Sequence, residues 1–169
     1  RRLLAYDGRE TAAAAATPDQ FLLPDGKPMP FLAAVDGGLS VGTPGVLRML
    51  EAAHKAHGKL PWKDLFEPAI KLSEEGFVIS PRMSVSIAGS AARIKAQGER
   101  GASYFLNADG TAKAAGTLRK NPELAATLRA IAAGGADAFY KGDIAKDIVA
   151  KVVSHPTNPG KLALDDLSD

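Results

Sequence analysis

The stretch GTPGVLRMLEAAHKAHG, residues 42–58, indicates how most of this chain folds. It contains Thr43 and Pro44, a polar residue directly before a proline. At the head of a helix such a side chain can cap the first turn, and the missing N–H of proline costs nothing there. Apolar residues then follow helical spacing at positions 46, 47, 50 and 53, and Gly58 offers a left-handed stop. We therefore predict a helix that follows Thr43-Pro44 and ends at Gly58.

The same pairing of a polar residue with a proline recurs further along the chain, at Glu67-Pro68, Ser80-Pro81 and Asn121-Pro122. Because a residue before proline resists the helical region, the segment that ends at Glu67 should be a separate short turn. We predict a short turn at 61–66, a helix at 68–75 closed by Gly76 and a helix at 81–97 closed by Gly98. A further helix at 122–133 is closed by Gly134-Gly135 and has positions 124, 128 and 131 on one face. The last helix starts at about 144 and ends before Pro156.

Signals for strands are few. Short apolar runs lie at residues 3–6, 31–35 and 39–41, and residues 107–110 read as the turn of a small hairpin around 104–106. The fold class is therefore α+β and mostly helical, in a single region over 1–169 with short strands in 1–42 and a helical region in 43–169. Residues 3–6 would form an edge strand without enough neighbours. Together with Arg1 as first residue and the unfinished helix start at 164–169, this leads us to expect a piece of a longer protein.

Composition excludes several classes of protein. With 169 residues, 46% of them apolar and 24% charged, the chain is neither disordered, collagenous nor membrane-spanning. The net charge of +2 is scattered, without a run of lysine or arginine, so we expect no nucleic-acid partner and no membrane insertion in this segment. The absence of cysteine removes thiol nucleophiles, thiolate metal sites and disulfides.

Several clusters could carry chemistry but have simpler explanations. Residues 37–45 are rich in glycine and open a helix, yet they lack a phosphate-binding fingerprint, which favours turn geometry and close packing. Glu51 with His54 is half of a di-metal motif whose second half is missing, so His54 and His57 are better explained as last-turn residues that complement the helix dipole. Three acidic pairs likewise fit solvated helix faces or helix starts: 74–75, 143 with 147, and 165–166. We expect no metal and no cofactor.

Arg9 lies in the sequence DGRETA, residues 7–12, directly after the first predicted strand. A guanidinium in a loop at the end of a strand can bind a substrate carboxylate through two parallel hydrogen bonds. The alternative is a surface ion pair with Asp7 or Glu10, which is common and contributes little to stability. From the residues alone both interpretations stay open.

These motifs resemble those of a known family, the gamma-glutamyltransferases, which are also called gamma-glutamyltranspeptidases or glutathione hydrolases. DGRETA resembles the family's Arg-Glu-x-Ala-Pro segment, and GTPG at 42–45 resembles its Gly-x-Pro-Gly helix start. Further matching motifs follow in order at 60–70, 74–77, 121–125, 135–142 and 164–167. Together they span nearly the whole chain. One departure is Ala13, where the family usually has proline, and it bears on the rigidity of the loop after Arg9.

The resemblance implies an interior stretch of the large subunit of an N-terminal-nucleophile hydrolase with a four-layer αββα fold. Such a precursor cuts itself into a large and a small subunit. The nucleophile is the threonine newly exposed at the start of the small catalytic subunit, where its own α-amine can act as base. The enzyme cleaves gamma-glutamyl amides such as glutathione and passes the acyl group to water, an amino acid or a peptide. We therefore expect no catalytic residue in this chain, which alone should be inactive.

The resemblance also implies a role for Arg9, because it matches the arginine that holds the α-carboxylate of the gamma-glutamyl group. Arg9 is the one substrate-binding residue expected here. The implied partners are the small catalytic subunit of the same precursor and a gamma-glutamyl substrate. The implied localisation is periplasmic or secreted.

Other functions stay open at this point. A related acylase for glutaryl-type side chains or a poly-gamma-glutamate transferase would share the scaffold and differ in substrate. A non-catalytic helical binding module would fit a composition that indicates no particular chemistry. That module should fold cooperatively alone, whereas a fragment should expose apolar faces and unpaired strand edges.

Overall fold

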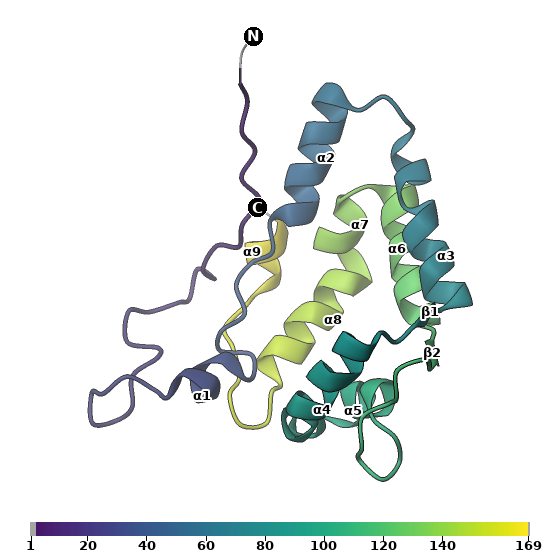
Figure 1. The fold of residues 1–169 in the computed structure, drawn as a ribbon. Helices are drawn as coiled ribbons and strands as arrows, with labels where there is room; N and C mark the ends of the chain where they lie inside the picture. Colours follow the sequence, from purple (N-terminus) through teal and green to yellow (C-terminus); the bar gives the residue numbers. More distant parts are fainter. Residues whose placement is uncertain (1–2, 169) are drawn as a thin grey trace. The chain divides into compact units, whose positions relative to one another are not determined.

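The computed structural model describes residues 3–168, about half of which lie in helices (Figure 1). The chain forms two compact units: Arg1–Leu65 with Arg129–Asp169 is the first unit, and Phe66–Leu128 is the second unit. The prediction of a single region over 1–169 stays a prediction. No helix within residues 3–168 is both long and apolar enough to cross a membrane.

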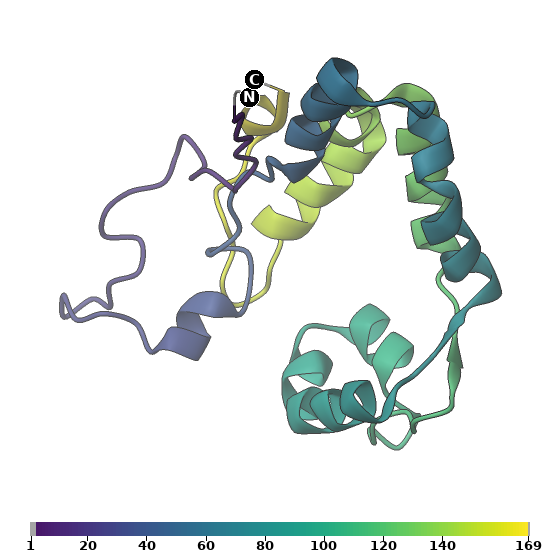
Figure 2. The same cartoon turned by 45° about the horizontal axis from the view of Figure 1, so that its top comes forward.

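The first unit packs its helices around one apolar core. Its described elements are α1 (Phe31–Val35), α2 (Val46–His57), η1 (Trp62–Leu65), the last turns of α6 (Pro122–Gly134), α7 (Asp137–Tyr140), α8 (Gly142–Val153) and α9 (Leu164–Ser168). Residues 3–30 run through this unit without a helix (Figures 1 and 2). The buried residues of the core come from α7, α8 and the segment that ends in α9: Ala136, Tyr140, Ala145, Val152, Leu162 and Leu167. Leu47 of α2 packs against them.

The second unit has its own small core. Its elements are α3 (Glu67–Glu75), β1 (Phe77–Val78), α4 (Pro81–Ala96), α5 (Glu99–Phe105), β2 (Leu118–Arg119) and the first turns of α6. The two short strands pair antiparallel, with Phe77 opposite Arg119. Helices α4 and α5 lie side by side (Figures 1 and 2) and enclose Ile79, Ile87 and Leu106.

The longer helices of the second unit follow the sequence prediction because their ends carry real capping contacts. Ser80 accepts a hydrogen bond from the Met83 N–H at 3.1 Å and so caps α4. Asn121 Oδ1 accepts one from the Leu124 N–H at 2.9 Å at the start of α6. Gly76 closes α3 with a φ of 95°, a conformation that glycine adopts readily.

Helix α2 ends at Gly58 as predicted, but its start and the conformation of Gly58 differ from the prediction. The helix begins at Val46, and its N-cap is Gly45 rather than Thr43, without any side-chain cap. Gly58 has a φ of −64°, so the predicted left-handed stop is wrong. A glycine fits there because a Cβ atom would overlap the His54 ring. In α6, the predicted face is also only partly right, because Leu124 is exposed.

The predicted strands are wrong. Within residues 3–42 there is no strand, and residues 31–35 form α1 instead. A five-residue apolar run carries no periodicity that separates a short helix from a strand, which explains the error. The predicted turn at 107–110 is present beside an isolated bridge between Leu106 and Ala112, but the residues before it form α5. About half of residues 3–168 lie in helices and very few in strands, so helices are the main regular structure, as predicted.

Candidate functional site

The loop that carries Arg9, residues 7–11 (the Arg9 loop), lies along the segment that leads into α2. The Thr11 N–H donates to the Thr43 carbonyl at 3.1 Å, and the Thr43 N–H donates back to the Thr11 carbonyl at 2.8 Å. This isolated antiparallel bridge fixes the end of the Arg9 loop against a segment 32 residues away in sequence (43 minus 11). The position of Arg9 therefore depends on the N-terminal side of α2.

Glycines allow this close approach. A Cβ on Gly42 would lie 2.7 Å from the Thr11 carbonyl oxygen, and one on Gly45 would lie 2.9 Å from the carbonyl oxygens of both Gly8 and Arg9. Real Cβ atoms do not come so near to backbone atoms. The prediction that residues 37–45 serve backbone geometry and close packing is confirmed at these positions.

The Arg9 side chain is 81% exposed, and its Nε donates to Glu10 Oε1 at 3.2 Å. The Arg9 backbone N–H donates to Asp7 Oδ1 at 3.0 Å, which tightens the loop. Hydrogen bonding with its own backbone and then with the Arg9 side chain lowers the pKa of Glu10. The ion pair with Glu10, one of the two interpretations left open by the sequence, is thus present, but an exposed pair is weak. That Arg9 also binds a substrate stays a prediction.

A cavity of about 260 Å³ opens beside the Arg9 loop, and Arg9 itself does not line it. Its polar lining residues are Glu10, Thr11, Gln20, Ser40 and Lys161. A carboxylate and an ammonium group therefore border one opening, next to an exposed guanidinium. Such a set can bind a ligand that carries both an ammonium and a carboxylate group.

Position 13 has alanine instead of proline, and other contacts hold the segment after Arg9 in place. Ala13 packs against the core of the first unit. The Ala14 N–H donates to Asp166 Oδ1 at 2.8 Å, and the Ala163 N–H donates to Asp166 Oδ2 at 2.8 Å. These two donors, Ala14 first, lower the pKa of Asp166. The interpretation of residues 165–166 as the start of a helix is confirmed, since both lie in the first turn of α9.

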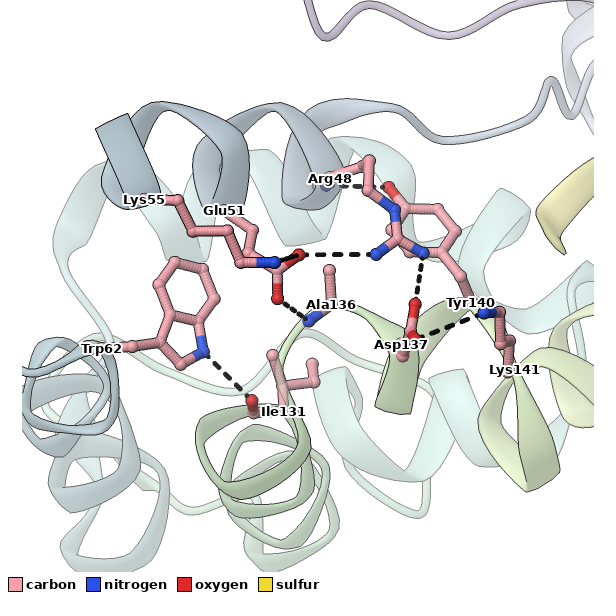
Figure 3. A network of polar contacts seen from close by, with 9 residues as sticks. All are labelled: Arg48, Glu51, Lys55, Trp62, Ile131, Ala136, Asp137, Tyr140 and Lys141. Carbon is pink, nitrogen blue, oxygen red and sulfur yellow. Dashed lines mark hydrogen bonds and ion pairs between the residues drawn. The ribbon is translucent and has the colours of Figure 1, made fainter. Parts of the chain in front are cut away.

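Helices α2 and α7 exchange hydrogen bonds through side chains that the sequence analysis did not assign to a site (Figure 3). The Ala136 N–H at the N-cap of α7 donates to Glu51 Oε1 at 2.8 Å. In the other direction, the Arg48 N–H near the start of α2 donates to the Tyr140 hydroxyl at 3.3 Å. Gly135 has a φ of 68°, and a Cβ there would overlap Glu51 Oε1.

Ion pairs surround these hydrogen bonds between α2 and α7. The Arg48 guanidinium lies 2.8 Å from Asp137 Oδ1 and 3.5 Å from Glu51 Oε2, and 4.8 Å above the centre of the Tyr140 ring. Lys55 Nζ lies 3.0 Å from Glu51 Oε2. The spacing of Arg48, Glu51 and Lys55 along one helix face was the signal in the sequence. Nothing in the sequence indicated the partners on α7.

The two histidines of α2 lie in its last turn, as predicted. His54 Nε2 is 2.8 Å from the Leu60 carbonyl oxygen, and His57 Nε2 is 2.8 Å from the Tyr6 hydroxyl. Both rings thus hold neighbouring segments of the first unit. Across residues 3–168, no three histidine, aspartate or glutamate side chains gather as metal ligands would.

Comparison with known proteins gives the family. The family model described as Gamma-glutamyltranspeptidase matches residues 1–169. Glutathione hydrolase 2 of Arabidopsis thaliana is 40% identical over 150 residues, which cover 88% of this chain and 24% of the relative. The glutathione hydrolase proenzyme of Bacillus subtilis is 39% identical over 142 residues, which cover 84% of this chain and 24% of the relative.

A solved structure agrees with the sequence relatives. The gamma-glutamyltranspeptidase of Helicobacter pylori superposes with a TM-score of 0.87 at 32% identity, over 96% of this chain and 45% of that one. The chain spans about a quarter of the length of the curated relatives it matches. It belongs to the gamma-glutamyltranspeptidase family.

Proposed function

We propose that this chain is part of the large subunit of an enzyme that cleaves gamma-glutamyl amides such as glutathione. The enzyme transfers the gamma-glutamyl group to water, an amino acid or a peptide. A family match over residues 1–169 and relatives named glutathione hydrolase support this proposal. The coverage of about a quarter of those relatives supports a partner portion that holds the catalytic threonine. The word proenzyme in the name of the Bacillus subtilis relative supports a precursor that is processed.

The proposed reaction has two steps. The threonine hydroxyl of the small subunit attacks the gamma-carbonyl, its proton passes to the free α-amine, and the amine of the substrate leaves with a proton. The resulting gamma-glutamyl ester is then attacked by water or by an acceptor amine, which restores the hydroxyl. This chain supplies no atom to either bond change. Its contribution is to hold the gamma-glutamyl group in position.

Arg9 carries the proposed binding step. Its guanidinium is exposed, it engages Glu10 through Nε, and it stands on a loop that the Thr11–Thr43 bridge fixes. The fork of the guanidinium matches the two oxygens of an α-carboxylate, a geometry that lysine does not offer. Glu10 lies beside it and, with its lowered pKa, is ionised at neutral pH to receive the α-ammonium. The exposed guanidinium on a loop whose end is bridged to Thr43 is the observation on which the proposed role of Arg9 rests.

The test is Arg9→Ala in the full-length enzyme. We expect the donor kcat/KM to fall, because the carboxylate loses a charged bidentate contact. The loss of transition-state stabilisation should be about 2–5 kcal/mol. Self-cleavage should stay intact, and Arg9→Lys should recover only part of the loss. The readouts are donor kinetics with a chromogenic gamma-glutamyl amide and subunit bands on a denaturing gel.

Arg100→Ala is the matched control, because Arg100 is also exposed and also pairs with an exposed carboxylate, Glu123, at 2.7 Å. Its donor kinetics should not change. Unchanged donor kinetics in Arg9→Ala would sink the proposed role of Arg9. A panel of glutaryl and poly-gamma-glutamyl substrates separates the proposed enzyme from a related acylase or a poly-gamma-glutamate transferase.

The wider setting follows from the same proposal. The chain would contribute helices to a four-layer αββα fold, and its superposition on the Helicobacter pylori enzyme supports that assignment. The partner would be the small catalytic subunit of the same precursor. The enzyme would act in the periplasm or outside the cell, and fractionation with an antibody against this chain tests that localisation.

A further inference from the structure

The N-terminal turn of α2 lacks the side-chain cap that such turns usually have. Its N-cap is Gly45, which has no side chain to accept from the first free N–H groups. The Arg48 N–H, at the third helical position, donates instead to the Tyr140 hydroxyl at 3.3 Å. Tyr140 is buried in the core of the first unit and belongs to α7. Tyr140, 92 positions away from Arg48 in sequence, therefore serves as the cap of α2.

The opposite contact completes a reciprocal arrangement. Helix α7 has no side-chain cap of its own, and the Ala136 N–H at its start donates to Glu51 of α2 at 2.8 Å. Asp137 in the first turn of α7 pairs with the Arg48 guanidinium at 2.8 Å. Each helix thus caps the other, as Figure 3 shows. We call the contacts of Tyr140 and Asp137 with Arg48, and of Glu51 with Ala136, the reciprocal cap.

The Arg9 loop rests on the same turn of α2 that the reciprocal cap holds. Gly8 packs so closely on Met49 that a Cβ there would lie 2.6 Å from Met49 Cβ. Gly45 touches the carbonyl groups of Gly8 and Arg9. Any shift of this turn therefore moves the backbone of Arg9.

We infer that the reciprocal cap is a positioning device for Arg9, with the Tyr140 hydroxyl and Arg48 as its central members. This inference rests on the proposed function of Arg9. The cap touches no substrate and acts through α2 alone. Removing it loosens the first turn of α2, and a small displacement of a binding group is enough to weaken a bidentate contact.

Tyr140→Phe in the full-length enzyme is the test, because it removes one hydroxyl and keeps the buried ring. We expect the donor KM to rise about tenfold, with kcat changed less than twofold. In an Arg9→Ala background, Tyr140→Phe should have no further effect on donor KM, since the group it positions is gone. A merely structural role would lower the melting temperature without this dependence on Arg9.

Tyr104→Phe is the matched control. Tyr104 also lies under an arginine, with the Arg119 guanidinium 4.3 Å from its ring centre, and it belongs to the second unit. Tyr104→Phe should leave the donor KM unchanged both in the parent enzyme and in the Arg9→Ala background. If Tyr140→Phe does not yield folded enzyme, Asp137→Asn weakens the cap from the more exposed side of Arg48 and should give the same pattern.

The outcomes separate this inference from the proposed function. If Arg9→Ala raises donor KM but the effects of Tyr140→Phe and Arg9→Ala multiply, the inference is wrong and the role of Arg9 stands. A donor KM for Tyr140→Phe equal to that of the parent enzyme also overturns it. If Arg9→Ala itself changes nothing, both are overturned together.

Discussion

At the scale of single residues, Glu51 joins α2 to the start of α7. It is largely buried, with 13% of its side chain exposed, and it accepts from Ala136, Lys55 and Arg48. The Ala136 N–H is the main cause of its lowered pKa, and burial opposes that shift. Since the folded state favours the ionised form, the stabilisation is present above the ordinary pKa of 4.5 and is lost as pH falls through the lowered folded value.

Glu51→Gln should therefore destabilise this chain at neutral pH. We expect a loss of about 1.5–3 kcal/mol at pH 7, because a hydrogen-bonded charge becomes a neutral amide. The difference from the parent should shrink as pH falls from 4.5 through the lowered folded value, below which the parent carboxylate is neutral as well. Urea unfolding at pH 7 and pH 3 measures both. Glu123→Gln, which changes an exposed ion pair, is the control, and equal losses for Glu51→Gln at the two pH values would contradict this account.

Residue-level contacts were predictable only where the partners are neighbours in sequence. The pairing of Arg9 with Glu10 and the caps of Ser80 and Asn121 follow from local spacing. The contact of Arg48 with Tyr140 joins positions 92 apart, and no local pattern encodes it. The cavity beside the Arg9 loop could not be predicted either, because its walls come from residues 10–42 and from Lys161.

At the scale of elements, α4 depends on one capping hydroxyl. Ser80→Ala removes the acceptor of the Met83 N–H, and we expect the free energy of unfolding to fall by about 1 kcal/mol. Ser86→Ala, at an exposed position in the same helix, is the control and should be neutral or slightly stabilising, because alanine has the higher helix propensity. Urea unfolding followed by circular dichroism compares the two. An equal loss in both variants would show that the hydroxyl does not act as a cap.

The helices that the sequence pattern did not predict are short. Helix α7 has 4 residues and α1 has 5, so neither can be stable by itself. Tertiary contacts, such as the Glu51 carboxylate at the start of α7, decide that they form. Helix α4, with 16 residues, a cap and a glycine stop, has enough local signal to be predicted within one residue.

At the scale of the whole molecule, large apolar side chains are exposed on both units. Phe31 is 78% exposed in the first unit and Val85 is 72% exposed in the second. Such surfaces fit the expectation for an interior stretch of a larger enzyme and give no support to a self-contained binding module.

The 169-residue chain on its own should therefore release no product from a chromogenic gamma-glutamyl amide, because the proposed threonine nucleophile lies on another portion. The full-length enzyme under the same conditions is the positive control. Turnover by the isolated chain above the buffer blank would refute this expectation and would require a nucleophile within these residues.

The overlap that a Cβ at Gly135 would make with Glu51 links two positions that lie far apart in the chain. An alanine at 135 would displace the end of the Glu51 side chain, which accepts from the Ala136 N–H. In the evolution of this family, positions 51 and 135 should therefore change as a pair, so that any sequence with a side chain at 135 also carries a shorter residue at 51.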